Sequence, residues 1–218
     1  SSNLVPDDSN GTWDVFLHDR WNGTTERVSI TEDGIEGDFF SGDPAISGDG
    51  RVVAFSSGWT YRVAGSYPGW HGVLIHDRLD NSLQAYGYNP TGDIHVNALN
   101  PALSADAQLV AFCSNADDLV PYGENGDYDI FVHDRATGTD RLVSFGLEKP
   151  GVYSKFDYPA LSADGRFLAF VSHGLETNVF VADLQDTGTP VHWGMRATPA
   201  AGGTTNPGSG SWPVRTDE

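Results

Sequence analysis

The chain has 218 residues, of which 39% are hydrophobic and 19% are charged, so it is long and apolar enough for a substantial core in one large domain or two small ones. Lysine and arginine number 12 against 30 aspartates and glutamates, and this net charge of −18 argues against nucleic acid or an anionic membrane as a partner. The single cysteine, Cys113, excludes an intrachain disulfide and cysteine-based zinc or redox sites, and no apolar run is long enough to insert into a bilayer.

In chain order, the first predicted strand carries the sequence Val-Phe-Leu-His-Asp-Arg over residues 15–20. A longer block then begins at Asp43 with Asp-Pro-Ala-Ile-Ser-Gly-Asp-Gly-Arg-Val-Val-Ala-Phe, and close copies of it begin at Asn100 and Tyr158. The His-Asp-Arg segment also returns, at residues 76–78 and 133–135, and a weaker copy, Val-Phe-Val-Ala-Asp-Leu, lies at residues 179–184. Two motifs that alternate at a nearly constant period are typical of a repeat architecture.

Each repeat unit is predicted to form four short antiparallel strands. The first strand, Pro-Ala-Ile/Leu-Ser, leads into an Asp-Gly dipeptide that favours a two-residue hairpin. The second is a continuous apolar run, typical of a sheet buried on both faces, and is expected over residues 52–56, 109–114 and 167–172. The third strand carries His-Asp-Arg, and the fourth follows an Asn-Gly or Thr-Gly turn and is expected over residues 26–30 and 141–145. Because no segment shows a helical period, the sequence predicts an all-β propeller of four-stranded antiparallel blades.

The count of strands bears on how such a propeller closes. Pairs of third and fourth strands occur four times and pairs of first and second strands three times, so we expect three complete blades plus partial flanking strands, about four blades in all. The approximate units of this single propeller domain or fragment are residues 1–42 (partial), 43–99, 100–157 and 158–218 (partial). Either the missing blades belong to the same parent chain, or the two ends combine into an imperfect fourth blade, or a homodimer completes one ring.

The sequence Ser-Ala-Asp-Gly-Arg-Phe-Leu-Ala-Phe at residues 162–170 resembles the SPDGKxIAF signature of TolB-like, WD40-like (PD40) propeller repeats. The string from Ser2 to Arg20 resembles the SNLVPxDxNGxxDVFxxDRxTG string of a bacterial secreted or periplasmic subset. The resemblance implies a β-propeller in an extracellular or periplasmic location. It implies little about activity, because such repeats occur in binding scaffolds and beside hydrolase domains alike.

The loop before the first predicted strand spaces oxygen ligands around a glycine turn, as calcium loops do. With the third-blade copy of the loop, the candidate metal ligands are Asp7, Asp8, Asn10, Asp14, Asn125 and Asp129. The alternative is a structural Asx turn in which Asp14 or Asp129 bonds to loop amides. That alternative is favoured, because the bidentate glutamate of a full EF-hand loop is missing from its expected position. Calcium is therefore a hypothesis here, and the sequence indicates no other cofactor.

The His-Asp-Arg triplets have the composition of a catalytic or metal site, but they recur from blade to blade. Equivalent positions on neighbouring blades lie about 10 Å apart, which is too far for shared coordination of one zinc ion. We therefore expect the aspartate and arginine to form ion pairs at the strand end or between blades. The repeated serines Ser47, Ser104 and Ser162 are expected to bond turn amides rather than to act as nucleophiles.

Residues outside the repeat pattern, and those that open the first strand of each unit, are the better candidates for recognition. The predicted binding residues are Trp59, Tyr61, Trp70, His71, Asp43, Asn100 and Tyr158. The alternative role of the aromatics is local packing of the long loop expected over residues 61–71, between the second and third strands of its unit. The leading interpretation is a non-enzymatic recognition scaffold, stabilised by calcium, that binds a protein or a carbohydrate through its loop faces. The alternatives are a hydrolase or lyase with a metal or His/Asp site at the channel, and a structural segment of a larger secreted protein.

Overall fold

The computed structural model describes residues 4–6, 8–37, 39–58, 71–86, 97–116, 119–120, 127–144, 155–173, 177–185 and 192–195, and these contain no helix. The first sheet pairs β1 (Phe16–Asp19) with β2 (Thr24–Arg27). The second contains β3 (Ser41–Ile46), β4 (Val52–Gly58), β5 (His71–Asp77) and β6 (Ser82–Tyr86). The third contains β7 (Ala98–Leu103), β8 (Leu109–Ser114), β9 (Asp129–Asp134) and β10 (Thr139–Leu142). The fourth contains β11 (Lys155–Leu161), β12 (Phe167–His173), β13 (Thr177–Asp183) and β14 (His192–Met195).

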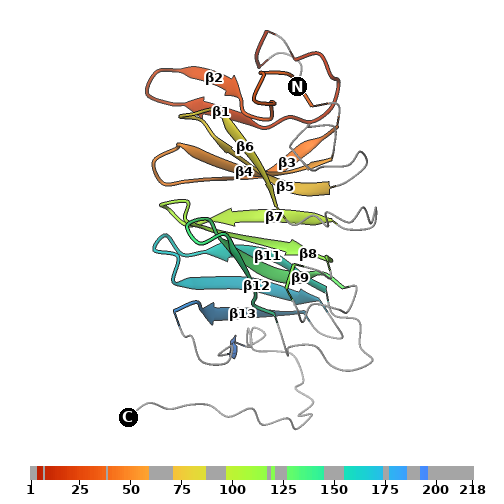
Figure 1. Ribbon diagram of the computed structural model, residues 1–218, viewed down its shortest axis with the longest axis vertical. Helices are drawn as coiled ribbons and strands as arrows, with labels where there is room; N and C mark the ends of the chain where they lie inside the picture. Colours follow the sequence, from red (N-terminus) through yellow and green to blue (C-terminus); the bar gives the residue numbers. More distant parts are fainter. Residues whose placement is uncertain are drawn as a thin grey trace, which may run out of the picture.

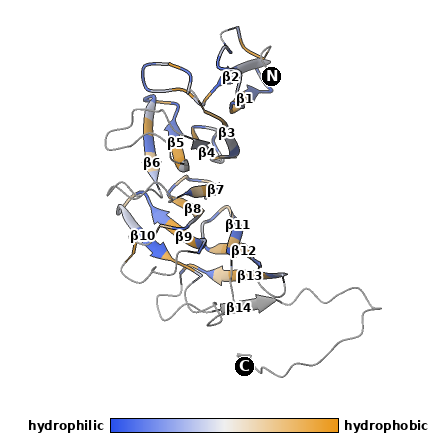
Figure 2. Ribbon diagram, turned by 90° about the vertical axis from the view of Figure 1, so that its right-hand side faces the viewer, coloured by the Kyte–Doolittle hydropathy of each residue, from blue (hydrophilic) through white to orange (hydrophobic). Residues whose placement is uncertain are grey.

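Each four-stranded sheet is an antiparallel meander, in which every strand pairs with the next one along the chain. We call the four sheets blades one to four, in chain order. They follow one another along the long axis of the molecule, from β1 and β2 at the top of Figure 1 to β13 near the bottom. In Figure 2 the first strands β3 and β7 lie toward the right and the last strands β6 and β10 lie at the left edge. The prediction of antiparallel blades, about four in all, is confirmed.

The turn between the first two strands of a blade is longer than predicted. In blade two, Ser47 N donates to Val52 O (2.9 Å) and Gly50 N donates to Ser47 O (3.0 Å), so residues 48–51 separate the paired ends. The Ser47 hydroxyl accepts the hydrogen bond from Val52 N (2.9 Å). In a two-residue hairpin a backbone carbonyl accepts this bond, so the use of the side chain lengthens the turn. The fourth strands begin earlier than predicted, because pairing starts directly after the preceding turn, at Asp19 with Thr24 in blade one.

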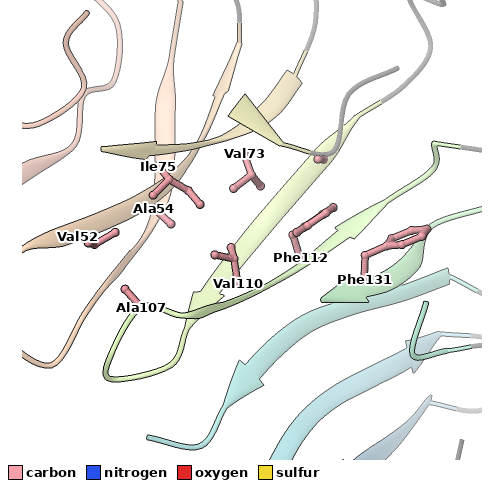
Figure 3. Packing of buried hydrophobic residues seen from close by; sticks show 9 residues of the cluster. Val52, Ala54, Val73, Ile75, Ala107, Val110, Phe112 and Phe131 are labelled. Carbon is pink, nitrogen blue, oxygen red and sulfur yellow. The ribbon is translucent and has the colours of Figure 1, made fainter. Parts of the chain in front are cut away.

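The core lies between the blades. All of β4 is buried, and its alternating side chains serve two separate clusters. Val53 and Phe55 pack toward blade one, whereas Val52 and Ala54 pack toward blade three. The second cluster continues into blade three, where the rings of Phe112 and Phe131 stack with centroids 5.9 Å apart, and its residues are shown in Figure 3. Burial of this apolar area holds consecutive blades together.

Backbone hydrogen bonds also join consecutive blades, through the turns between their first and second strands. Gly48 N donates to Ala105 O (2.8 Å), and Ala105 N donates to Ala163 O (2.9 Å). These three turns therefore form a continuous ladder across blades two, three and four. The ladder sets the spacing of the first strands, β3, β7 and β11, which contact one another in that order.

The face of blade four that points away from blade three repeats the apolar pattern of the buried faces. Phe167 and Val179 occupy the positions that Val52 and Val73 occupy in blade two. Val52 and Val73 are 4% and 0% exposed, whereas Phe167 and Val179 are 40% and 42% exposed. Blade four therefore presents an interface-like face that is less covered than the same face of blade two.

Candidate functional site

The repeated serines serve the turns, as predicted. Ser104 is 1% exposed, and its hydroxyl donates to Asp106 Oδ1 (2.6 Å) and accepts from Leu109 N (3.0 Å). Ser47 and Ser162 make the same two bonds in blades two and four. The hydrogen bond from the Ser104 hydroxyl, and to a lesser extent that from the Gln108 amide, stabilises the Asp106 carboxylate and lowers its pKa from the usual value. This network gives the serines a structural role and does not place them as nucleophiles.

The aspartate and arginine of the blade-two triplet form ion pairs, as predicted, with partners outside the triplet. Arg51 from the turn of the same blade bonds Asp77 through Nε (2.8 Å) and Nη2 (2.7 Å), and this contact lowers the pKa of Asp77. Arg78 reaches across to blade one, where its Nε bonds Glu26 Oε1 at 2.6 Å. His76 is 5% exposed, and both of its ring nitrogens have partners within the fold. The triplet therefore joins strand, turn and neighbouring blade.

Three carboxylates lie close together at the loop that precedes β1. Asp8, Asp14 and Glu36 each place one oxygen so that the three lie within 4.8 Å of one another. Glu36 was not among the predicted ligands, and its carboxylate accepts from Ser9 N (2.9 Å) and Ser9 Oγ (2.6 Å). Burial opposes ionisation of Glu36, but the Ser9 bonds and the charge of Arg27 hold its pKa below the usual value. The loop itself contains no glutamate ligand, and Glu36, which lies 27 positions after Ser9, supplies a carboxylate at the same place.

The predicted alternative, an Asx turn, is present in this loop. Asn10 Oδ1 accepts from Thr12 N (2.9 Å), and Asn10 Nδ2 donates to Asp14 Oδ2 (3.0 Å). Asn10 thus directs its amide nitrogen, not its oxygen, at the carboxylates. Asp14 accepts the Ser29 hydroxyl (2.6 Å), and Asp129 makes the same bond to a serine in blade three. These contacts give Asn10, Asp14 and Asp129 a structural role without a metal.

A cation of the protein itself already lies at the carboxylate cluster. Arg27 pairs with Glu36, and its Nη1 lies 3.7 Å from Asp8 Oδ1. The guanidinium therefore offsets part of the negative charge that a metal ion would offset. Two of the predicted ligands, Asp7 and Asn125, lie outside the described residues.

Three predicted binding residues share one unusual backbone conformation. Asp43, Asn100 and Tyr158 have φ values of 49°, 54° and 52°, in the left-handed region that residues with a side chain rarely adopt. Each precedes a proline, and each lies in a bulge where the pairing of the first two strands shifts register. Such backbone strain costs about 1–3 kcal/mol per residue and is concentrated at functional sites.

These residues form a row along the first strands β3, β7 and β11, and we call Asp43, Asn100 and Tyr158 the inner row. One repeated backbone position thus presents a carboxylate, an amide and a phenol on consecutive blades. Asp43 is exposed, Asn100 is half-buried and Tyr158 is 61% exposed. The Tyr158 ring meets His173 edge to face, with centroids 6.3 Å apart.

A buried carboxylate fixes the middle of the inner row. Asp157 is 4% exposed and bonds Lys155 Nζ (2.8 Å), Asn100 Nδ2 and Tyr158 N (3.0 Å). Burial opposes its ionisation, but these donors, Lys155 first, hold the pKa of Asp157 below the usual value. Burial and the same carboxylate raise the pKa of Cys113, so this thiol stays protonated and is not a nucleophile.

The predicted loop aromatics Trp59, Tyr61 and Trp70 lie outside the described residues. The sequence prediction placed His71 in the same loop. The structure corrects this placement, because His71 is the first residue of β5 and pairs with Gly58 of β4. The strand extends one residue further than expected, since β4 itself continues to Gly58 and supplies the partner.

Comparison with known proteins identifies the fold. No family model matches the sequence, and no curated protein matches it. Among solved structures, TolB from Acinetobacter baumannii is similar at 19% sequence identity with a TM-score of 0.52, over 83% of this chain and 37% of that chain. The fold is that of a TolB-like β-propeller. At this identity the likeness concerns the fold alone, and the present chain spans 37% of the TolB chain.

Two further structures are similar at lower scores. The β-propeller domain of the trilobed protease from Pyrococcus furiosus has 18% identity and a TM-score of 0.49, over 73% of this chain and 44% of that chain. Oligogalacturonate lyase from Vibrio parahaemolyticus has 12% identity and a TM-score of 0.46, over 78% of this chain and 42% of that chain. Within the described part of this chain, no helix is long and apolar enough to cross a membrane.

Proposed function

We propose that this chain is a recognition module that binds a protein partner along the inner row. The observation that carries the proposal is the repetition of one strained conformation with three different side chains. A position that served folding alone would favour glycine at such φ values, because glycine adopts them without steric cost. Asp43, Asn100 and Tyr158 instead keep a polar or aromatic side chain there.

The composition of the inner row fits a protein surface. Exposed tyrosine combines a large apolar ring with a hydroxyl and is enriched at interaction hot spots. Asp43 adds a charge that selects a basic or hydrogen-bond-donating partner. The resemblance of the repeat to a secreted or periplasmic subset supports a partner outside the cytoplasm, and carbohydrate is the second ligand class to be tested.

A capture experiment tests this function. The immobilised chain, and variants Tyr158→Ala and Asp43→Ala, would be exposed to secreted and periplasmic protein from the source organism. Trp21→Ala is a matched control, because Trp21 is 95% exposed but lies in the turn after β1, away from the inner row. We expect one protein that binds wild type and Trp21→Ala and loses at least about tenfold affinity for the inner-row variants. Equal retention by all variants, or capture on a glycan array alone, would contradict the proposal.

We also propose that a further β-sheet covers the exposed face of blade four, around Phe167 and Val179. The supporting observation is their exposure at positions that are buried in blade two. The sheet would come from a second copy or from additional blades of the same parent chain. Light scattering on a size-exclusion column, with Val179→Lys as the variant, tests the second copy: a dimer that the variant dissociates supports it, and a monomer in both excludes it.

Calcium at the Asp8, Asp14 and Glu36 cluster stays a separate proposal, supported by the three close carboxylates. Extracellular modules bind calcium with dissociation constants of about 0.1–1 mM, and an ion here would compete with Arg27. Calorimetry should show millimolar binding that Glu36→Gln abolishes. Absence of any heat of binding at millimolar calcium would rule the site out.

A further inference from the structure

The junction between blades one and two contains an ion pair that spans both blades. Arg78 Nε bonds Glu26 Oε1 of β2 at 2.6 Å, and Arg78 Nη1 donates to Gly50 O in the turn of blade two at 2.6 Å. The guanidinium thus lies between a carboxylate of one blade and a turn carbonyl of the next. A hydrogen bond between two ionised groups is stronger than one between neutral groups.

The crevice between blades two and three keeps the arginine but lacks the carboxylate. Arg135 follows Asp134 as Arg78 follows Asp77, and its Nη1 donates to Ala107 O at 3.0 Å. The strand register places Gln84 at the position of Glu26, since Gln84 pairs with Ile75 as Glu26 pairs with Leu17. A neutral amide therefore stands where blade one has a carboxylate.

A positively charged residue of blade two is also replaced by a neutral one in blade three. Gln108 stands at the position of Arg51, whose guanidinium holds Asp77 in blade two. Between Gln84 and Gln108 is a surface pocket of about 400 Å³, which Tyr86, His133 and Arg135 also line. The volume lies within the range of small-molecule sites, about 300–1,000 Å³.

The polar groups of the pocket leave one donor without a partner. Arg135 Nε is buried and has no acceptor among the described residues, although the Tyr86 hydroxyl lies beside the Arg135 side chain. The Tyr86 hydroxyl donates to Gln84 Oε1 (2.8 Å), and the His133 ring packs against Tyr86 with centroids 4.1 Å apart. His133 Nδ1 is bonded to Asp140 Oδ1 at 3.0 Å, so the ring is held in place. A buried N–H without an acceptor is unfavourable, and a ligand oxygen would supply the missing acceptor.

The other carboxylates near Arg135 are already engaged. Its charge acts on Asp77, which Arg51 holds through two bonds. Asp106, at the rim of the pocket, accepts from Ser104 Oγ at 2.6 Å and from the Gln108 amide at 3.0 Å. Neither carboxylate forms an ion pair with Arg135 among the described residues.

We propose that this pocket binds a carboxylate, which takes the place that Glu26 has at the junction of blades one and two. The ligand would be an organic acid or an acidic side chain of a protein, with its oxygens on Arg135 and its carbon chain against Tyr86. Arginine is suited to this role because its planar fork matches a carboxylate. The net charge of −18 opposes an anion at long range, but at physiological salt this field is screened beyond about 8 Å. The inference does not depend on the recognition of a protein by the inner row.

The substitution Gln84→Glu tests the proposal, because it places a carboxylate of the protein itself in the pocket. Melting temperature would be measured in sodium glutarate and in sodium chloride of equal ionic strength. For wild type we expect a glutarate-specific rise of about 3–6 °C at ten times the dissociation constant. Gln84→Glu should melt higher than wild type and lose the glutarate response. Gln185→Glu makes the same change on the exposed surface of blade four and should keep that response.

Two further arms identify the ligand and the residue. An acetylated and amidated peptide with one central glutamate, compared with its glutamine analogue, distinguishes a protein side chain from a free acid. Either source supports the proposal, provided that Arg135→Gln abolishes the response. The proposal is wrong if neither glutarate nor the peptide raises the melting temperature at up to 50 mM, or if Gln84→Glu and Arg135→Gln respond as wild type does.

Discussion

Two glycines at equivalent turn positions provide a measurement of the contact between blades. Gly50 and Gly165 have φ values of 74° and 69°, so an alanine at either position is strained by about 1–2 kcal/mol. Reduced freedom of the unfolded chain offsets about 0.4–1 kcal/mol of that strain. A Cβ at Gly50 would meet only Ile46 Cδ1, at 3.9 Å. We therefore expect Gly50→Ala to destabilise the protein by about 1 kcal/mol.

At Gly165 the added atom would also touch blade three. Its Cβ would lie 3.1 Å from Leu109 Cδ1 and 3.4 Å from Ser104 Cβ, and overpacking of this kind costs about 1–3 kcal/mol. Because a leucine methyl can shift, we expect the lower end, which makes Gly165→Ala about 1 kcal/mol worse than Gly50→Ala.

Urea unfolding of both variants, and of each combined with Leu109→Val, tests this reasoning. The valine lacks the clashing Cδ1 atom, so it should recover about 1 kcal/mol in the Gly165→Ala background only. That energy corresponds to about 2–4 °C in melting temperature for a chain of this size. Equal destabilisation by the two alanines, or no coupling to Leu109→Val, would refute the packing of blade four on blade three described above.

Three other substitutions follow from the same structure. Phe112→Ala, at a side chain that is 0% exposed between blades two and three, should cost about 3–5 kcal/mol in urea unfolding. Ser104→Ala removes a buried hydroxyl that accepts from Leu109 N and should cost about 1–3 kcal/mol by the same assay. Asp157 has a lowered pKa in the folded state, so its contribution to stability is complete above about pH 5 and is lost as the pH falls through the folded pKa. Asp157→Asn should therefore be less stable at pH 7 and should flatten the loss of melting temperature between pH 5 and pH 2.

The repeat was sufficient to predict the blades, because their information is local. A proline, a serine and an apolar run recur in fixed order, and each fixes a piece of backbone within a few residues. Ser104 could be assigned to its turn for the same reason. The turn length was wrong, since the sequence does not show that the serine hydroxyl replaces a carbonyl as the acceptor.

The features that were missed depend on distant segments or on strand register. Glu36 reaches Ser9 across 27 positions, and no spacing rule links the two. The left-handed φ of Tyr158 is unpredictable from residue type, since a bulky residue before a proline ordinarily excludes it. The change from Glu26 to Gln84 is visible in the sequence, but it acquires meaning only when the register shows that the two are equivalent.

Hydrogen exchange, measured with and without the captured partner, tests most directly whether the inner row is the recognition surface. The amides of β3, β7 and β11 would be compared with those of β6 and β10 at the opposite edge of the blades (Figure 2). We expect bound partner to slow exchange around Asp43, Asn100 and Tyr158 and to leave β6 and β10 unchanged. Protection confined to β6 and β10, with the inner row exchanging as in the free chain, would contradict the account.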